Sequence, residues 1–231
     1  MTSAMTSPAT STLEKSQSSP ARRRRRAVIW GIVVVLTVVI SAAVIWETGL
    51  RWQFFPRKFG VVESGFLYRS GQISPRMIGP TLDKYRIDRV IFMSTDNDRD
   101  DIRAEIAACS ARNIARVNYP LGGKGTGRVE SYVNALVDIA AARAAKQQVL
   151  VHCHTGSQRT GGVVVFFRVL LDGWSAERAR DELLANGHEP DENEHLIPYI
   201  NANMRAVAQG LVDRGVLAEM PAELPVVAEG P

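Results

Sequence analysis

Cysteine is scarce in this chain, which contains only Cys109 and Cys153 among its 231 residues. Two cysteines form at most one disulfide, and one disulfide is too few for a fold of this length to depend on disulfide bridges. The composition is otherwise that of a folded globular protein, with 45% hydrophobic and 23% charged residues. Any cysteine chemistry must therefore come from an individual thiol on an ordinary folded domain.

An excess of charge of one sign is also missing from most of the chain. Five arginines stand together at 22–26, and without them the chain is close to neutral, although its formal net charge is +4. A nucleic-acid-binding domain carries its excess of basic residues on its folded surface. We therefore expect no nucleic-acid partner.

Charged residues are missing altogether from 27–46, a stretch dominated by valine and isoleucine. About 20 residues of helix rise roughly 30 Å, the thickness of a bilayer core. Trp30 and Trp46 stand near the two ends, where indole rings favour the headgroup layer. The stretch predicts a transmembrane helix, with a buried core helix or a cleaved signal peptide as the alternatives.

The two flanks of this helix differ in basic residues. The arginine block precedes it, whereas only Arg51, Arg57 and Lys58 follow closely. By the positive-inside rule the amino terminus is cytoplasmic and the folded domain extracytoplasmic. The sequence thus divides into a disordered basic cytoplasmic tail (1–26), the transmembrane helix (27–46), a connector (47–59), the folded domain (60–215) and a mobile tail (216–231).

Short runs of strand-forming residues alternate with helical stretches in the folded domain. Such alternation predicts an α/β fold, a parallel sheet with helices on both faces, in which ligands bind beyond the carboxyl ends of the strands. The predicted strands are 65–71, 89–94, 115–119 and 148–152, and the predicted helices are 74–86, 98–112, 128–146, 158–172, 175–186 and 192–214.

The run that carries chemistry follows the last predicted strand and reads His-Cys-His-Thr-Gly-Ser-Gln-Arg-Thr-Gly at 152–161. Five residues between Cys153 and Arg159 can curl so that their backbone N–H groups converge on one phosphate, assisted by the positive end of the next helix. The same cradle lowers a thiol pKa, which makes Cys153 a nucleophile. Arg159 offers a planar fork for two phosphate oxygens, and Thr160 a hydroxyl that can hydrogen-bond to the sulfur.

These residues resemble the H-C-x5-R-[ST] signature of the cysteine-dependent protein tyrosine and dual-specificity phosphatase superfamily. The hydrophobic run 149–153 and the run Gly-Phe-Leu-Tyr-Arg-Ser-Gly-Gln at 65–72 resemble compact dual-specificity-like members, and the likeness covers roughly 60–210. It implies hydrolysis of phosphate esters through a phosphocysteine, without metal or cofactor. The implied catalytic residues are Cys153, Arg159 and Thr160, and the implied phosphate-binding residues are His154, Thr155, Gly156, Ser157, Gln158 and Arg159.

An aspartate is missing where this superfamily usually carries its general acid, on a mobile loop ahead of the cysteine. Residues 120–130 contain no aspartate, and Glu130 is their only carboxylate. Other candidates are Asp96, Asp98 and Asp191, for which the alternative is a plain helix-start role. Since a general acid contributes about 10²- to 10⁴-fold in rate, its identity matters.

Several other interpretations stay open. The glycine-rich segment 122–127 lacks the residue order of a nucleotide-binding loop, so we interpret it as a flexible loop whose Lys124 or nearby Arg128 either touches substrate or is merely solvated. Cys109 is either a small buried residue or a redox partner of Cys153. A zinc cluster around His152 and His154 is disfavoured, because neighbouring residues on a strand point to opposite faces.

The substrate is the least defined part of the prediction. The loop lacks the extra lysines that resembling inositol-phosphate phosphatases often present, which favours a phosphorylated protein over a phospholipid or inositol phosphate. A membrane-anchored pseudophosphatase, which binds phosphate without turning it over, is the alternative from outside the enzymes. The intact Cys153, Arg159 and Thr160 argue against it.

Overall fold

The computed structural model describes residues 20–96 and 98–228. The chain divides into two units, Met1–Thr48 and Gly49–Pro231, which we describe separately. The predictions for residues 1–19 and for the last three positions of the carboxy-terminal tail lie outside the described residues.

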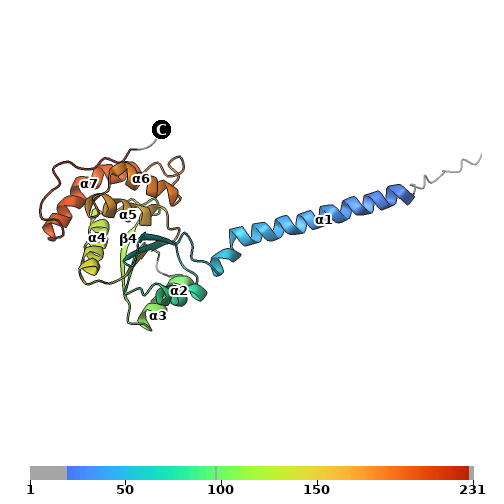
Figure 1. Cartoon of the computed structure of the whole chain (residues 1–231), viewed down its shortest axis with the longest axis horizontal. Helices are drawn as coiled ribbons and strands as arrows, with labels where there is room; N and C mark the ends of the chain where they lie inside the picture. Colours follow the sequence, from blue (N-terminus) through green and yellow to red (C-terminus); the bar gives the residue numbers. More distant parts are fainter. Residues whose placement is uncertain (1–19, 97, 229–231) are drawn as a thin grey trace, which may run out of the picture. The chain divides into compact units, whose positions relative to one another are not determined.

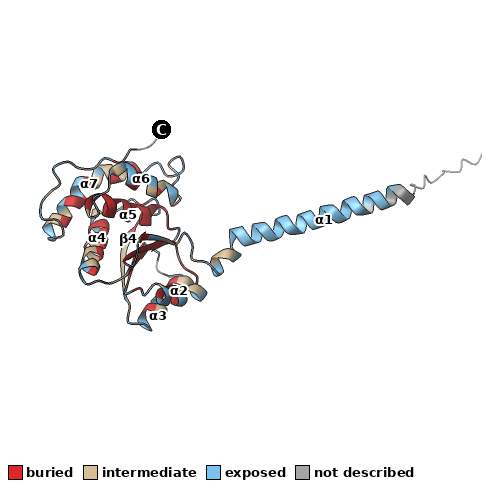
Figure 2. Ribbon diagram, viewed as in Figure 1, coloured by how far each residue is buried: buried red, intermediate tan, exposed pale blue. Residues whose placement is uncertain are grey.

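The first unit contains one helix, α1 (Pro20–Thr48). The most apolar window of its segment Arg24–Thr48 has a mean hydropathy of 2.9 and contains no buried residue, as the pale blue ribbon of Figure 2 shows. The hydroxyls of Thr37 and Thr48 donate to the carbonyls of Val33 and Val44 at 2.9 and 2.7 Å, so they are satisfied inside the helix. The helix is therefore long and apolar enough to cross a membrane.

The second unit begins with a short 3-10 helix, η1 (Leu50–Gln53), and is built on one five-stranded sheet of order β1-β2-β5-β3-β4. Neighbouring strands pair in parallel except β1 and β2, which are antiparallel, so the predicted all-parallel sheet is corrected to a mixed one. The sequence analysis had no strand at β1, because four residues are too few to show a hydrophobic period. The strands are β1 (Gly60–Glu63), β2 (Leu67–Ser70), β3 (Arg89–Ser94), β4 (Ala115–Leu121) and β5 (Val149–His152).

Helices cover both faces of the sheet, as predicted (Figure 1). Side chains of the central strand β5 alternate between two hydrophobic clusters: Val149 and Val151 pack in the larger cluster and Leu150 in the smaller. The smaller cluster includes residues of α2 (Pro75–Lys84) and α3 (Asp100–Ser110). The larger includes residues of α4 (Val129–Ala144), α5 (Gln158–Leu170), α6 (Ala176–Ala185) and α7 (Leu196–Asp213).

Helix α5 has every residue buried, since it packs between the sheet and the helices α4, α6 and α7. Its first turn follows directly on the loop from β5, so a fully packed helix holds the end of that loop.

Part of the segment 216–231, which the sequence predicts as a mobile tail, packs against the folded domain. Val227 is buried against the larger cluster, and its backbone exchanges two 2.8 Å hydrogen bonds with the Asn201 side chain. The Asn201 side-chain amide thus satisfies both the N–H and the C=O of Val227, as a neighbouring strand would. Composition alone does not predict such a tertiary contact.

Candidate active site

The loop 152–161 lies where three parallel strands end. Strand β5 leads into Cys153, and the helix α5 starts at Gln158 after the N-cap residue Ser157. Register pairs Ser70 of β2 and Phe92 of β3 with His152, so the ends of these strands flank the loop. The site thus lies beyond the carboxyl ends of the strands, where the α/β pattern predicted it.

Cys153 is fully buried at the base of this loop, and its thiol is held by the loop itself. The Gly156 N–H donates to Sγ at 3.2 Å. The Thr160 hydroxyl is also buried, and apart from its interaction with the thiol it has no hydrogen-bond partner among the described residues. Burial raises the pKa of Cys153, but hydrogen bonds from Thr160 and the charge of Arg159 outweigh it and hold the pKa below its usual value. The thiolate is therefore more accessible at Cys153 than at an ordinary cysteine.

Arg159 points its guanidinium at the end of β3. Its Nη1 donates to Ser94 Oγ at 2.7 Å, while its buried Nε has no partner among the described residues. The side chain is only 6% exposed, so one anchoring bond fixes the fork and leaves donors for an anion. Sequence reasoning placed Ser94 on a strand but gave it no role.

The curl of the loop depends on Gly156 and on a second arginine. Gly156 has φ +79°, and a Cβ there would lie 2.5 Å from the Gly71 nitrogen, so only glycine fits. Its carbonyl accepts a 2.6 Å hydrogen bond from Arg69 Nη2, a side chain only 1% exposed. Burial lowers the pKa of Arg69 to about 10, which leaves it positive at neutral pH. The sequence signal for Arg69 was a charged residue directly after the apolar run 66–68, within the predicted strand 65–71.

A buried polar network lies on the other side of the loop, centred on Glu105. The carboxylate lies 3.0 Å from His152 Nε2 and accepts hydrogen bonds from Gln72 Nε2 at 3.1 Å and Arg116 Nε at 2.8 Å. Burial alone raises the pKa of Glu105, but His152 and Arg116 outweigh burial and lower it. Gln72 also donates its backbone N–H to the His154 carbonyl at 2.9 Å. The network therefore contacts the loop on both sides of Cys153, at His152 and at His154.

Two further side chains contact the outer part of the loop. Lys58 Nζ donates to Ser157 Oγ at 2.6 Å, and His188 Nδ1 lies 2.6 Å from Gln158 Oε1. Burial lowers the pKa of His188, which favours the neutral ring. Neither residue was assigned to the loop from sequence, because both lie on segments far from it along the chain.

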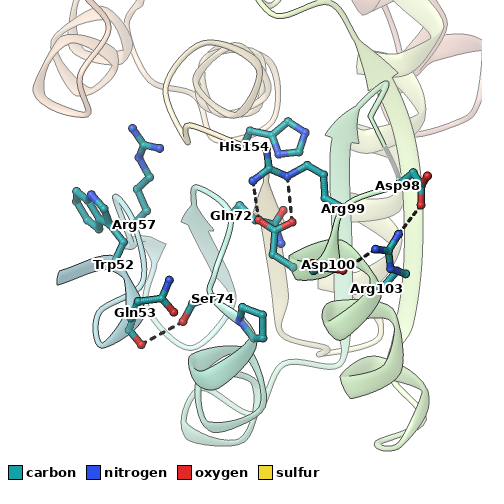
Figure 3. Close-up of a pocket in the computed structure, with 12 residues that line it drawn as sticks. Trp52, Gln53, Arg57, Gln72, Ser74, Asp98, Arg99, Asp100, Arg103 and His154 are labelled. Carbon is teal, nitrogen blue, oxygen red and sulfur yellow. Dashed lines mark hydrogen bonds and ion pairs between the residues drawn. The ribbon is translucent and has the colours of Figure 1, made fainter. Parts of the chain in front are cut away.

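A pocket of about 610 Å³ opens beside His154 (Figure 3). One wall is the connector, with Trp52 and Arg57, and the opposite wall is the segment 98–103 at the start of α3. The floor between them includes Gln72 and Ser74, and the Ser74 hydroxyl donates to the Gln53 carbonyl at 3.2 Å. His154 is the loop residue that lines this pocket, so the pocket adjoins the loop.

The candidate general acids are dispersed in the structure. Asp96 Oδ2 lies 3.8 Å from His154 Nε2, and Asp98 lines the pocket but pairs with Arg103. Glu130 instead lines a separate groove of about 360 Å³ between α4 and α7.

The helix-start role, the alternative for the acids near α3, applies to Asp100 and Asp101, which lie in its first turn, whereas Asp98 lies outside the helix. Its N-cap residue is Arg99, with no side-chain cap, and Arg99 pairs with Asp101 at 2.9 Å. Asp191 is exposed in a turn segment, because α7 begins at Leu196 rather than at the predicted residue 192.

The glycine-rich segment after β4 contacts the start of α5. Gly125 packs against Gln158, and its carbonyl accepts a 2.6 Å hydrogen bond from Tyr132 Oη. Lys124 and Arg128 are exposed on either side of it. The segment therefore borders the phosphate loop, while its two basic side chains point to solvent.

Cys109 packs in the smaller cluster, on the opposite face of the sheet from the cluster that holds Cys153. Burial raises its pKa to about 11. A buried thiol with a raised pKa is a poor redox partner. The structure favours the small buried residue among the two roles left open by the sequence.

Comparison with known proteins was made on sequence and on structure. No protein-family model matches the sequence, and no curated protein matches it. Solved structures do match. TpbA from P. aeruginosa is 21% identical with a TM-score of 0.50, over 60% of this chain and 81% of that chain.

Two more matches have similar values. The core catalytic domain of the PP-IP phosphatase SIW14 from S. cerevisiae, in complex with citrate, is 17% identical with a TM-score of 0.54, over 67% of this chain and 92% of that one. PTPMT1 in complex with PI(5)P is 15% identical with a TM-score of 0.51, over 68% and 98%. These likenesses show the fold alone: the chain shares the fold of TpbA, SIW14 and PTPMT1, which is the fold that the resemblance of the loop 152–161 to cysteine-dependent phosphatases implied.

Proposed function

We propose that this protein is a membrane-anchored phosphatase that hydrolyses phosphate monoesters through a phosphocysteine intermediate. The observation that carries the proposal is the pairing of a thiol of lowered pKa, Cys153, with an anchored guanidinium, Arg159, at opposite ends of one loop. That combination supplies a nucleophile and a clamp for the phosphoryl oxygens.

The reaction takes place in two steps. Cys153 Sγ attacks phosphorus, an S–P bond forms, and the P–O bond to the leaving group breaks as that oxygen receives a proton. Water then attacks the same phosphorus, the S–P bond breaks, and inorganic phosphate leaves with the thiolate regenerated. Backbone N–H groups of 154–158 and the Arg159 fork hold the phosphoryl oxygens throughout, and the Thr160 hydroxyl stabilises the departing sulfur.

We assign the proton donation to Asp96. Its carboxylate is near the loop residue His154 and remains partly exposed. Asp98 and Asp101 are each held by an arginine, and Glu130 lines another groove. Asp96 therefore has the best support among the acids considered.

The anchor is the helix α1. Its length, its hydropathy of 2.9 and the absence of buried residues in its most apolar window support a single membrane span. The arginine block before it favours an amino terminus inside and a catalytic domain outside the cytoplasm.

Two substrate classes fit this site. A phosphorylated protein is the class that the uncharged loop residues favour. A phosphoinositide or inositol phosphate is favoured by the Lys58 ammonium, which the structure brings to Ser157 from outside the loop. Structural relatives support it further, since PTPMT1 is bound to PI(5)P and SIW14 is a PP-IP phosphatase.

Hydrolysis of p-nitrophenyl phosphate by the full chain in detergent micelles tests the proposal. We expect turnover by the wild type and loss of turnover in Cys153→Ser and Arg159→Lys. No turnover by the wild type, with inorganic phosphate still bound, would support the pseudophosphatase instead. Turnover retained in Cys153→Ser would exclude a phosphocysteine.

A further inference from the structure

Two basic residues of the connector are fastened to the phosphate loop. The Arg57 carbonyl accepts a 2.7 Å hydrogen bond from the Gly71 N–H, and Gly71 packs against the backbone of Thr155. Lys58 Nζ donates to Ser157 Oγ at 2.6 Å and reaches the Gly187 carbonyl at 3.4 Å. The connector is therefore part of the site.

Both cations lack a carboxylate partner. Among the ion pairs of the described residues, none involves Arg57 or Lys58. Burial lowers the pKa of Lys58, and the positive charges of Arg57 and Arg69 lower it further. Glu189 acts on Lys58 in the opposite direction but forms no ion pair with it. Several cations thus lie beside the loop with no carboxylate of the described residues bound to Arg57 or Lys58, which favours an anion there.

The Lys58 side chain is held beside the loop by two contacts. Its ammonium donates to Ser157 Oγ and reaches the Gly187 carbonyl, and the backbone at Lys58 has φ +45°, in the left-handed region that a lysine rarely adopts. These contacts place the charge of Lys58 next to the phosphate loop.

We propose that Lys58, together with Arg57, forms a second anion subsite, and that the substrate carries a second phosphate close to the one that is hydrolysed. This inference rests on the proposed phosphatase activity. While the ester phosphate occupies the loop, the second phosphate contacts the Lys58 ammonium and the Arg57 guanidinium. Lys58 then acts in binding and specificity, outside the chemical step.

The distribution of charge across the pocket favours a compact bisphosphate over an acidic peptide. Figure 3 shows Arg57 on one side of the pocket, with Asp98 and Asp100 on the side of α3. Arg99 and Arg103 also line that side and pair with its three carboxylates, so it keeps one negative charge in excess, which an extended acidic segment crossing the pocket would meet. Two phosphates on one small ring need only the basic side. Both a soluble inositol bisphosphate and a lipid headgroup have this chemistry.

The test compares kcat/KM of the full chain in micelles for p-nitrophenyl phosphate, an inositol monophosphate and an inositol bisphosphate. We expect the wild type to prefer the bisphosphate. Because a hydrogen bond to a charged group contributes on the order of 1.5–3 kcal/mol, Lys58→Met should lower kcat/KM for the bisphosphate about tenfold or more beyond its effect on p-nitrophenyl phosphate, mainly through KM. Lys58→Arg should retain the preference.

Lys146 provides a matched control, since it is also an exposed lysine with positive φ, at +55°, but follows α4. Lys146→Met should leave all three values unchanged. Vesicles containing a phosphoinositide bisphosphate distinguish the sources: faster turnover there than with the soluble compound identifies a lipid headgroup.

Three outcomes would overturn the inference. Equal losses on all substrates in Lys58→Met would make Lys58 a structural support of the loop. A wild type without preference for the bisphosphate would remove the second subsite. If Lys58→Met lowered kcat/KM only for an acidic phosphotyrosine peptide, the substrate would be a phosphorylated protein instead of a bisphosphate. A wild type inactive even on p-nitrophenyl phosphate contradicts the proposed function itself and is therefore distinguishable.

Discussion

Glu105 Oε2 lies 3.0 Å from His152 Nε2, and both side chains are fully buried beneath the phosphate loop. His152 immediately precedes Cys153, whereas Glu105 lies on α3, the helix between β3 and β4. The pair therefore couples the stability of the fold to the position of the nucleophile.

Removing the charge of Glu105 should destabilise the protein strongly. In Glu105→Gln, Arg116 and His152 lose their shared buried carboxylate, a kind of change that costs about 3–5 kcal/mol. Urea unfolding at neutral pH measures this loss in the free energy of unfolding. Asp83→Asn is the matched control, because Asp83 pairs with Arg112 at 2.7 Å on an exposed surface; it should leave the midpoint nearly unchanged.

The same carboxylate predicts the direction of acid sensitivity. The folded-state pKa of Glu105 lies below its usual value, so its contribution is present above the unfolded pKa and is lost as pH falls through the folded pKa. Unfolding midpoints of wild type and Glu105→Gln should therefore converge toward acid pH. A difference that persists unchanged there would contradict the pKa assignment.

The thiol of Cys153 should titrate below the ordinary cysteine value of about 8.5. Ultraviolet absorbance of the thiolate measures this, with Cys153→Ser as the reference, while Cys109 should titrate only near the value of about 11. Since Thr160 is the largest of the stabilising influences on the thiolate, Thr160→Val should raise the Cys153 pKa and Thr160→Ser should preserve it. Identical titrations of these two variants would show that the hydroxyl is not involved.

Arg69 should matter for catalysis without touching substrate. Its hydrogen bond to the Gly156 carbonyl holds the curl of the loop, and small misplacements of catalytic groups cost up to about 10²-fold in rate. We expect Arg69→Met to lower kcat by roughly 10- to 100-fold and to shift the Cys153 titration. Arg89→Met, which removes a partly buried ion pair with Asp138 at 3.2 Å, serves as control; a kcat loss as large as that of Arg69→Met would point to general destabilisation.

If Asp96 is the general acid, the loss of kcat on its substitution should depend on the leaving group of the substrate. Asp96→Asn should lower kcat by about 10²- to 10⁴-fold for an alkyl phosphate, which needs protonation on departure, and much less for p-nitrophenyl phosphate. Asp98→Asn, which only breaks an exposed pair with Arg103, should act weakly on both. If Glu130→Gln shows the leaving-group pattern instead, the acid lies at the start of α4.

The helix α1 should keep the full chain in the membrane fraction after alkaline extraction. Protease added outside intact cells should digest a tag at the carboxy terminus, because the arginine block favours a cytoplasmic amino terminus. A fully protected tag would reverse the orientation. Recovery of a soluble protein that has lost its first residues would identify a cleaved signal peptide.

Local sequence patterns were sufficient to predict most of the secondary structure and the reacting groups of this protein. Six helices and four of the five strands follow from hydrophobic period and capping residues. The reacting groups follow from the spacing of Cys153 and Arg159, because a nucleophile and a phosphate clamp on one short loop are neighbours along the chain. The membrane-spanning potential of α1 is likewise a property of one continuous segment.

The tertiary structure alone decided what supports the loop. Arg69 and Glu105 reach it because β2, β5 and β3 pair side by side, and Lys58 reaches it because the connector returns to Gly71. Such contacts join residues that are far apart in sequence, so no local period encodes them. The sequence by itself determined the nucleophile and its clamp, and only the folded sheet decided which charges surround them, because charges separated along the chain act together only once the strands bring them within a few ångströms.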